Sequence, residues 1–198
     1  LRMNNPTEEK KILRRELREK CKKLPLEQRN LADNAINNRL MNGELWRGIT
    51  KIAIYASDGS EPELKLFVQW AFNRGKKIFL PRYRCESQDY ELAEIHSLSR
   101  DLISGKYGIT EPAPHLRAAD SNEMAHEIAW VIPGVGFDAS GVRLGRGKGF
   151  YDRLLKGVNG RILGVFYQFQ LKESIPAEEH DRKMDCAVTE ENLYIFAK

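Results

Sequence analysis

A glycine-rich segment that also carries three cations is the part of this sequence best equipped for chemistry. In residues 143–149 glycines alternate with Arg146 and Lys148, and Arg143 opens the run. Glycine leaves the backbone bare, so its N–H groups can approach an anion closely, and a helix expected just behind the run would turn its N-terminus toward the same place. Arginine grips phosphate oxygens with paired donors, and lysine acts as a point charge. The segment therefore predicts a phosphate-binding site.

The spacing of these glycines excludes two common phosphate-binding patterns. A Walker A loop needs glycine five residues before the Gly-Lys pair, where this chain has Val142, and it needs Ser or Thr after the lysine, where Gly149 stands. The dinucleotide-binding fingerprint needs a third glycine where this chain has Phe150. A flexible, solvated loop with scattered charges is the alternative that these residues alone leave open.

The wider context of the segment resembles the signature of a known enzyme family. The run Gly136-Phe137-Asp138, followed by residues 143–152, is similar to the signature of the 5-formyltetrahydrofolate cyclo-ligase family. That signature is long and specific. Phe150 departs from it, because many members have a tyrosine there; the ring remains and its hydroxyl is lost. Further segments match in the expected order over nearly the whole chain, namely residues 10–14, 57–63, 81–83, 107–112 and 179–185.

The resemblance implies an ATP-dependent ligase that cyclises 5-formyltetrahydrofolate to 5,10-methenyltetrahydrofolate and releases ADP and phosphate. ATP would phosphorylate the formyl oxygen, which turns a poor leaving group into a good one, and N10 of the folate would then attack the activated carbon. The substrates supply both nucleophiles, which agrees with the absence of a serine, cysteine or histidine nucleophile motif. The rate enhancement would come from positioning and electrostatics.

On the residues that match the family, Arg146 and Lys148 are implied to be catalytic, and a larger set is implied to bind ATP. Lys10 and Arg14 lie four residues apart, so they would share one helix face and reach the ATP phosphates. An ordinary amphipathic helix with ion pairs to acidic neighbours is the alternative. The implied ATP-binding set is Lys10, Lys11, Arg14, Arg143, Leu144, Gly145, Arg146, Gly147, Lys148, Gly149, Phe150 and Tyr151.

The resemblance also implies that Glu61 holds the pterin ring, since a carboxylate can accept from the adjacent 2-amino and ring N–H donors. A glutamate at a helix start, favoured by the helix dipole, is the alternative. Tyr83 and Tyr107 could stack on the folate rings or could equally belong to the core or the rim. The implied substrate-binding set is Arg14, Ala56, Glu61, Tyr83, Tyr107, Arg146, Gly147, Lys148, Gly149 and Phe150.

Asp152 and Asp181 are the carboxylates that the resemblance assigns to Mg²⁺, the expected cofactor. Mg²⁺ prefers hard oxygen ligands and shares them with phosphate oxygens and water. A helix-start aspartate and a turn aspartate are the alternatives. His180 adjoins Asp181, and a surface or supporting role fits it better than acid–base chemistry. For both carboxylates to bind one ion, the C-terminal segment must fold back over the mouth of the site.

Strands that alternate with helices must position these residues. This pattern predicts a three-layer α/β fold with an open, mostly parallel, Rossmann-like sheet and helices on both faces. Ligands in such folds bind outside the carboxyl ends of the strands. We expect a single domain over residues 1–198, with residues 1–43 as N-terminal helices packed on it. Strands are expected at 51–56, 77–81, 90–95, 129–133, 162–166, 186–189 and 193–196, and helices at 7–23, 27–41, 61–75 and 150–156.

Composition and charge narrow the class of protein. Residues 1–30 hold ten Lys or Arg against five Asp or Glu, so the net charge of +4 arises from one segment. A nucleic-acid binder usually has a broad basic face, which disfavours an RNA-binding module. Carboxylates at positions 61, 152 and 181 would also repel a polyanion. A nucleotide or anion sensor on the same fold is the other alternative to an enzyme.

Cellular context is predicted from what the sequence carries. Three scattered cysteines, Cys21, Cys85 and Cys186, form no disulfide or zinc pattern and indicate reduced thiols in the cytoplasm. The sequence contains no run of roughly 18 apolar residues, so we expect no membrane span, and we expect no secretory signal after Leu1. The expected partners are ATP and the folate substrate alone, with no nucleic acid and no membrane, and the chain is expected to be a monomer or a homodimer.

Overall fold

A seven-stranded, mostly parallel sheet forms the centre of the molecule in the computed structural model, which describes residues 6–105, 108–177 and 182–197. The strand order is β12-β11-β9-β6-β1-β2-β3. The five inner strands are parallel, and the edge strands β3 and β12 run antiparallel to their neighbours. The bounds are β1 Lys51–Ala53, β2 Lys77–Arg84, β3 Asp89–Ile95, β6 Ile128–Pro133, β9 Ile162–Val165, β11 Cys186–Val188 and β12 Leu193–Ile195.

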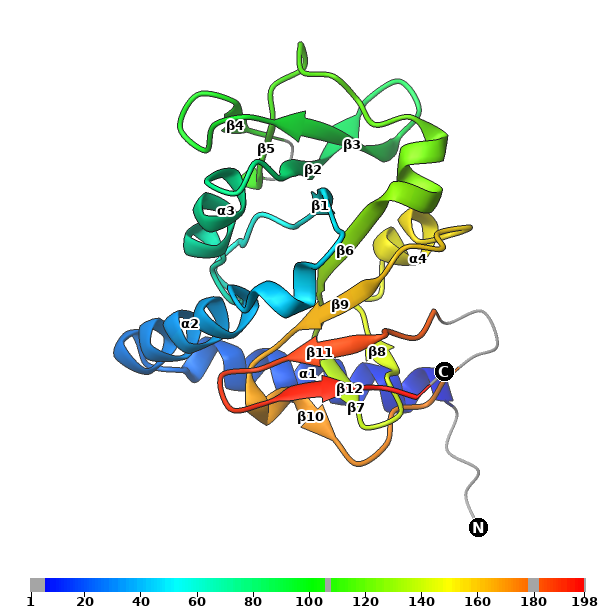
Figure 1. Ribbon diagram of the computed structural model, residues 1–198. Helices are drawn as coiled ribbons and strands as arrows, with labels where there is room; N and C mark the ends of the chain where they lie inside the picture. The colour runs from blue at the N-terminus through cyan, green and yellow to red at the C-terminus, as the bar shows by residue number, and fades with distance from the viewer. Residues whose placement is uncertain (1–5, 106–107, 178–181, 198) are drawn as a thin grey trace.

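Helices cover both faces of this sheet, so the inner strands are apolar on both sides. Helices α2 (Leu26–Leu40) and α3 (Lys65–Phe72) lie on one side, and α4 (Phe150–Leu154) lies on the other (Figure 1). Successive side chains along a strand point to opposite faces of the sheet, so they pack in different layers. Ile52 packs in the cluster that contains helix residues of α2 and α3, whereas Ala53 packs in the cluster that contains residues of α4.

A smaller sheet carries the glycine-rich segment. It has the order β10-β7-β8, and its strands are β7 Gly136–Asp138, β8 Arg143–Leu144 and β10 Leu171–Lys172. Helix α1 (Pro6–Lys23) packs on it through the fully buried Leu17, which joins Val135, Val142, Leu144 and Ile175 in a separate apolar cluster. The N-terminal helix is thereby tied to the strands that lead into and out of the glycines.

Short elements complete the chain. They are the helical turns η1 Gly43–Trp46 and η4 Gln168–Gln170, the π-helical turn η3 Glu123–Glu127, and a hairpin of β4 Leu102–Ser104 with β5 Thr110–Pro112. Within the described ranges, no helix has the length and apolar character needed to cross a bilayer.

The predicted fold class is confirmed, and several element boundaries differ from the prediction, two of them at the edge of the site. The helix expected from residue 61 begins at Lys65, because the preceding carbonyl groups bind side chains instead of helix N–H groups. Ser57 donates to the carbonyl oxygen of Glu61, and Asn37 donates to that of Glu63. The strand expected at 77–81 continues through residues 82–84 in β2, where pairing with β3 extends it.

Candidate active site

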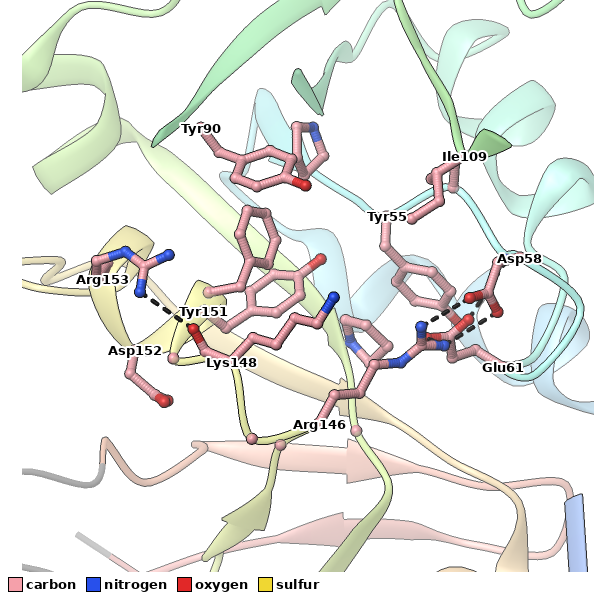
Figure 2. Close-up of a pocket in the computed structure, with 18 of the residues that line it drawn as sticks. Tyr55, Asp58, Glu61, Tyr90, Ile109, Arg146, Lys148, Tyr151, Asp152 and Arg153 are labelled. Carbon is pink, nitrogen blue, oxygen red and sulfur yellow. Dashed lines mark hydrogen bonds and ion pairs between the residues drawn. The ribbon is translucent and has the colours of Figure 1, made fainter. Parts of the chain in front are cut away.

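One pocket of about 530 Å³ opens at the carboxyl ends of the central parallel strands. Tyr55 and Ala56 follow β1 on one wall, Tyr83 of β2 forms another, and Pro133 and Gly134 close the floor at the end of β6. The glycine-rich segment that follows β8 forms the remaining wall (Figure 2). This is the position where open α/β sheets bind ligands.

Helix α1 holds the backbone of the glycine-rich segment by two arginines. Arg14 Nε donates to the carbonyl oxygen of Gly145 at 2.8 Å, and Arg18 Nη2 donates to that of Arg146 at 2.8 Å. At Gly147 the backbone φ is +90°, a left-handed conformation that side chains other than hydrogen disfavour. The path of this loop is therefore set by glycine conformation and by cations that α1 presents.

The buried carboxylate of Asp138 organises the turn that leads into the loop. Its Oδ1 accepts from the backbone N–H of Ser140 at 2.9 Å and of Val142 at 3.2 Å, while Oδ2 accepts from the N–H of Ile175 at 2.9 Å. These bonds satisfy donors that β7 and β8 leave unpaired, and they connect the turn to the segment after β10. The aspartate of the Gly-Phe-Asp run in the sequence signature is thus a structural support of the glycine loop.

The side chain of Arg146 crosses the pocket to the loop after β1. Its Nη1 lies 2.7 Å from Oδ2 of Asp58, and its Nη2 lies 3.0 Å from Oδ1 of the same carboxylate. Nη2 also donates to Ser60 Oγ and to Glu61 Oε1. Figure 2 shows the guanidinium held between Asp58 and Glu61, which we call the acid pair.

The acid pair shares one cation, and the two carboxyl groups respond in opposite directions. Hydrogen bonds from Arg146 hold the pKa of Asp58 well below its usual range. Burial and, next, the neighbouring Asp58 carboxyl raise the pKa of Glu61 to about 8, although Arg146 opposes the shift. Burial disfavours the charged form of Arg146, but its hydrogen bonds to Asp58 and the charge of Glu61 outweigh burial and raise its pKa. The buried glutamate therefore depends on a donor partner for its charge.

Aromatic rings line the side of the pocket opposite the acid pair. The ring centroids of Tyr83 and Tyr90 are 5.1 Å apart, and those of Tyr90 and Phe150 are 4.1 Å apart, both edge to face. Tyr151 continues the row at 4.7 Å from Phe150. Such a wall can pack against a flat heterocycle or an aryl ring.

Lys148 and Asp152 complete the loop side. Figure 2 shows the Lys148 amine directed into the pocket, and the Lys148 carbonyl oxygen accepts from Arg153 Nη1 at 3.2 Å. Asp152 Oδ1 pairs with Arg143 Nη2 at 2.8 Å. The Arg143 side chain is only 6% exposed and lies over the Tyr151 ring, whereas Asp152 is 47% exposed. The carboxylate of Asp152 is therefore open to solvent at the pocket edge.

Comparison with known proteins identifies the family. The sequence pattern of the 5-formyltetrahydrofolate cyclo-ligase family matches residues 6–190. This chain belongs to the 5-formyltetrahydrofolate cyclo-ligase family. The resemblance predicted from the sequence is thereby confirmed, and the pocket just described lies on a chain of this cyclo-ligase family.

Curated and structural relatives agree with that assignment. The 5-formyltetrahydrofolate cyclo-ligase of Mus musculus is 28% identical over 195 residues, which cover 92% of this chain and 94% of the relative. That of Saccharomyces cerevisiae is 32% identical over 162 residues, with 70% and 74% covered. The NMR structure of Aquifex aeolicus 5,10-methenyltetrahydrofolate synthetase superposes with a TM-score of 0.82 at 31% identity, covering 96% of this chain and 93% of the other.

Most residues predicted for the site of this cyclo-ligase family member line the pocket. They are Ala56, Glu61, Tyr83, Arg143, Gly145, Arg146, Gly147, Lys148, Gly149, Phe150, Tyr151 and Asp152. Arg14 contacts the loop from behind, through Gly145. Tyr107, His180 and Asp181 lie outside the described residues.

Three other predicted residues have side chains away from the pocket lining. Leu144 is buried against Leu17 in the apolar cluster beneath the loop. Lys11 is 75% exposed and pairs with Glu8 at 3.6 Å, as the amphipathic-helix alternative expects. Lys10 is buried on α1.

The pocket also contains residues that the sequence reasoning missed, including Arg18, Tyr55, Asp58, Tyr90 and Arg153. Arg18 carries a usable signal, because it stands one helical turn after Arg14 on the same face. The others lack a local signal.

The fit of the site to Mg²⁺ depends on few protein ligands. Within residues 6–105, 108–177 and 182–197, no three His, Cys, Asp or Glu side chains gather as a metal-binding group. Mg²⁺ commonly leans on one or two carboxylates and takes its remaining ligands from phosphate and water. Asp152, solvent-open beside the glycine loop, fits that pattern once its pairing with Arg143 is exchanged for the ion.

Proposed function

We propose that this protein converts 5-formyltetrahydrofolate and ATP to 5,10-methenyltetrahydrofolate, ADP and phosphate. The observation that carries the proposal is a single pocket with two chemically distinct sides, in a chain that belongs to the cyclo-ligase family. One side offers bare glycine backbone and cations. The other offers a buried carboxylate and an aromatic wall.

The glycine loop is the proposed phosphate side. The Lys148 amine and the backbone between Gly145 and Gly149 face the pocket. Lys10 and Arg14 of α1 are proposed to extend this positive environment from behind the loop. Positive charge fixed before the reaction stabilises the charge that develops on a transferring phosphoryl group without reorganisation.

The acid pair and the aromatic wall are the proposed folate side. Glu61 is 8% exposed and directed into the pocket, so an adjacent pair of N–H donors on a pterin would satisfy it. Tyr83, Tyr90 and Phe150 are proposed to pack against the folate rings. In the proposed arrangement the formyl group lies between the two sides, within reach of the glycine loop.

The proposed chemistry has two steps. The formyl oxygen attacks the γ-phosphorus of ATP, and the bond to the ADP oxygen breaks. N10 then attacks the activated formyl carbon and loses its proton to solvent, the carbon–oxygen bond breaks, and phosphate leaves with the electron pair. The chain contributes positioning and charge, with Arg146 and Lys148 proposed as the groups closest to the transferring phosphoryl. No protein nucleophile is needed.

Asp152 and Asp181 are the residues proposed to hold Mg²⁺. The ion would partly neutralise the phosphate oxygens of bound ATP. A cytoplasmic enzyme that acts on small molecules alone, as a monomer or homodimer, is the proposed context.

Following the absorbance of methenyltetrahydrofolate tests the function directly. Product absorbance should grow only when enzyme, ATP and 5-formyltetrahydrofolate are all present, and ADP should accumulate in equal amount. Binding of ATP without turnover would instead indicate a nucleotide sensor. A chain that turns over neither substrate would contradict the proposal.

A further inference from the structure

The guanidinium of Arg146 donates its hydrogen bonds on the side of the pocket opposite the proposed phosphate side. Its backbone belongs to the glycine loop, yet its guanidinium contacts Asp58, Ser60 and Glu61 on the opposite wall. The contact with Asp58 is two-pronged, at 2.7 and 3.0 Å. In this arrangement a cation of the loop is withdrawn from the phosphate side.

The guanidinium resembles the ligand that Glu61 is proposed to bind. A pterin presents a 2-amino group beside a ring N–H, which is an amidine-like pair of donors on one edge. Arg146 has an edge of the same kind: its Nη1 and Nη2 pair with Asp58, and Nη2 also donates to Oε1 of Glu61. One buried carboxylate oxygen cannot serve both at full strength, so the two occupants compete.

We propose that Asp58 is a positioning residue that holds the Arg146 guanidinium next to Glu61 when no folate is bound, an arrangement that we call the parked state. The pterin displaces Arg146 from Glu61, and the guanidinium then returns to the phosphate side. This inference rests on the proposed function. It makes folate binding and ATP binding cooperative, because the first substrate releases a cation that the second one uses. The parked arginine also supplies a donor to Glu61 when no folate is bound.

The surroundings permit this exchange with little movement. The backbone at Gly145 and Arg146 is fixed by Arg14 and Arg18, so only the Arg146 side chain has to turn. That side chain is 39% exposed, and Gly145 and Gly147 on either side present no side chains to obstruct it. Because Glu61 is buried, its charged form needs a donor partner, since an unpaired buried carboxylate is costly.

The measurable consequence is a change in the apparent affinity for ATP. When only a fraction of the molecules has Arg146 on the phosphate side, the apparent affinity for ATP is reduced by that fraction. Weakening the parked state must therefore strengthen ATP binding in the absence of folate. A residue with a merely structural role would leave ATP affinity unchanged or lower it.

Calorimetric titration with the non-hydrolysable β,γ-imido analogue of ATP and Mg²⁺ tests the proposal on the full chain. In the wild type, saturating 5-formyltetrahydrofolate should strengthen analogue binding roughly fivefold or more, the usual lower range of coupling between sites. Asp58→Asn should strengthen analogue binding without folate and should shrink the effect of folate. Glu63→Gln is the matched control in the same loop, because its 42% exposed side chain pairs with Lys65.

A second variant covers the case in which Asp58→Asn does not fold. Arg146→Gln should abolish the coupling and should strengthen folate binding measured alone, because the competitor is gone. Unchanged or weaker analogue binding by Asp58→Asn, with Glu63→Gln like the wild type, would overturn the proposal. If the wild type binds the analogue but not 5-formyltetrahydrofolate, the proposed function fails, while the analogue titration of Asp58→Asn still decides the role of Asp58.

Discussion

The Arg14 guanidinium and the Gly145 carbonyl group are joined by a 2.8 Å hydrogen bond across 131 positions of sequence. The same guanidinium lies behind Gly147, where an added Cβ would be 3.4 Å from Arg14 Cζ, an ordinary van der Waals contact. Helix α1 thus acts as a back support for the loop, and the loop needs glycine at position 147 because the backbone φ there is +90°.

Loss of this support should weaken ATP use more than stability. Arg14→Ala removes a charge-assisted bond, worth on the order of 1.5 kcal/mol at a partly exposed site, so we expect KM for ATP to rise about tenfold. Steady-state kinetics and thermal melting measure the two effects. Arg15→Ala, an exposed neighbour on the same helix, is the control and should match the wild type.

Lys148→Ala should damage ATP use more than folate binding. Removing one preorganised donor from a transition state typically costs about 100-fold in turnover. The kinetics should therefore show a fall of that order in kcat/KM for ATP, with folate affinity within about threefold of the wild type. Lys156→Ala, exposed just beyond α4, serves as the control. Unchanged turnover and KM for ATP would remove Lys148 from the site.

Glu61→Gln should weaken folate binding strongly and spare ATP binding. The amide can still accept one bond, but it loses the charge and presents a donor where a second donor of the ligand arrives. Fluorescence titration with 5-formyltetrahydrofolate should show about a 30-fold loss or more, as expected for a buried charged contact. Loss of ATP binding with intact folate binding would show that Glu61 serves the nucleotide.

Stability should depend on pH through Glu61. Burial and the Asp58 carboxyl raise the pKa of Glu61 from 4.5 to about 8, so the folded state binds more protons than the unfolded state between these values. The contribution of Glu61 is therefore fully present below about pH 4.5 and is lost as pH rises toward 8. Urea unfolding should show the wild type losing stability relative to Glu61→Gln across that window, by at most about 1.4 kcal/mol per pH unit. A pH-independent difference would contradict the assignment.

Asp152→Asn should raise the magnesium requirement without unfolding the protein. The ion is expected to lean on phosphate as well as carboxylate, so its affinity should be weak alone and should rise when nucleotide is present. Initial rates over a range of Mg²⁺ concentrations measure the shift, and Asp181→Asn should act in the same direction. Glu44→Gln, another acid paired with an arginine, is the control. Wild-type magnesium dependence in both aspartate variants would exclude them as ligands.

Features formed by residues that are neighbours in the sequence could be predicted, whereas contacts between residues far apart in the sequence could not. The glycine–cation run was visible because its components adjoin, and the sheet was visible from apolar strands that alternate with helices. The pairing of Arg146 with Asp58 spans 88 positions and depends on how the loop after β1 meets the loop after β8. No local pattern encodes that meeting.

The misplaced start of α3 has a similar cause. Glu61-Pro62 is a favourable local helix start, but Tyr55 Oη donates to the Pro62 carbonyl oxygen and Asn37 donates to that of Glu63. These tertiary bonds override the local preference and leave Glu61 free to enter the pocket. The pocket residue Glu61 therefore lies in the segment that local preferences wrongly assign to the helix.

The packing of Leu17 against Val135, Leu144 and Ile175 has a consequence for biosynthesis. Helix α1 leaves the ribosome early, but its apolar face has no native partner in this cluster until Val135 has been made, and the cluster is complete only when Ile175 has been made. At roughly 10 residues per second, that wait is on the order of ten seconds. During this time the apolar face of α1 that carries Leu17 is exposed, and chaperones that bind nascent chains could cover it. Ribosome-bound chains that stop short of Ile175 should consequently lack a formed phosphate loop, although β1, β2, β3, β6 and β9 of the central sheet have already been made.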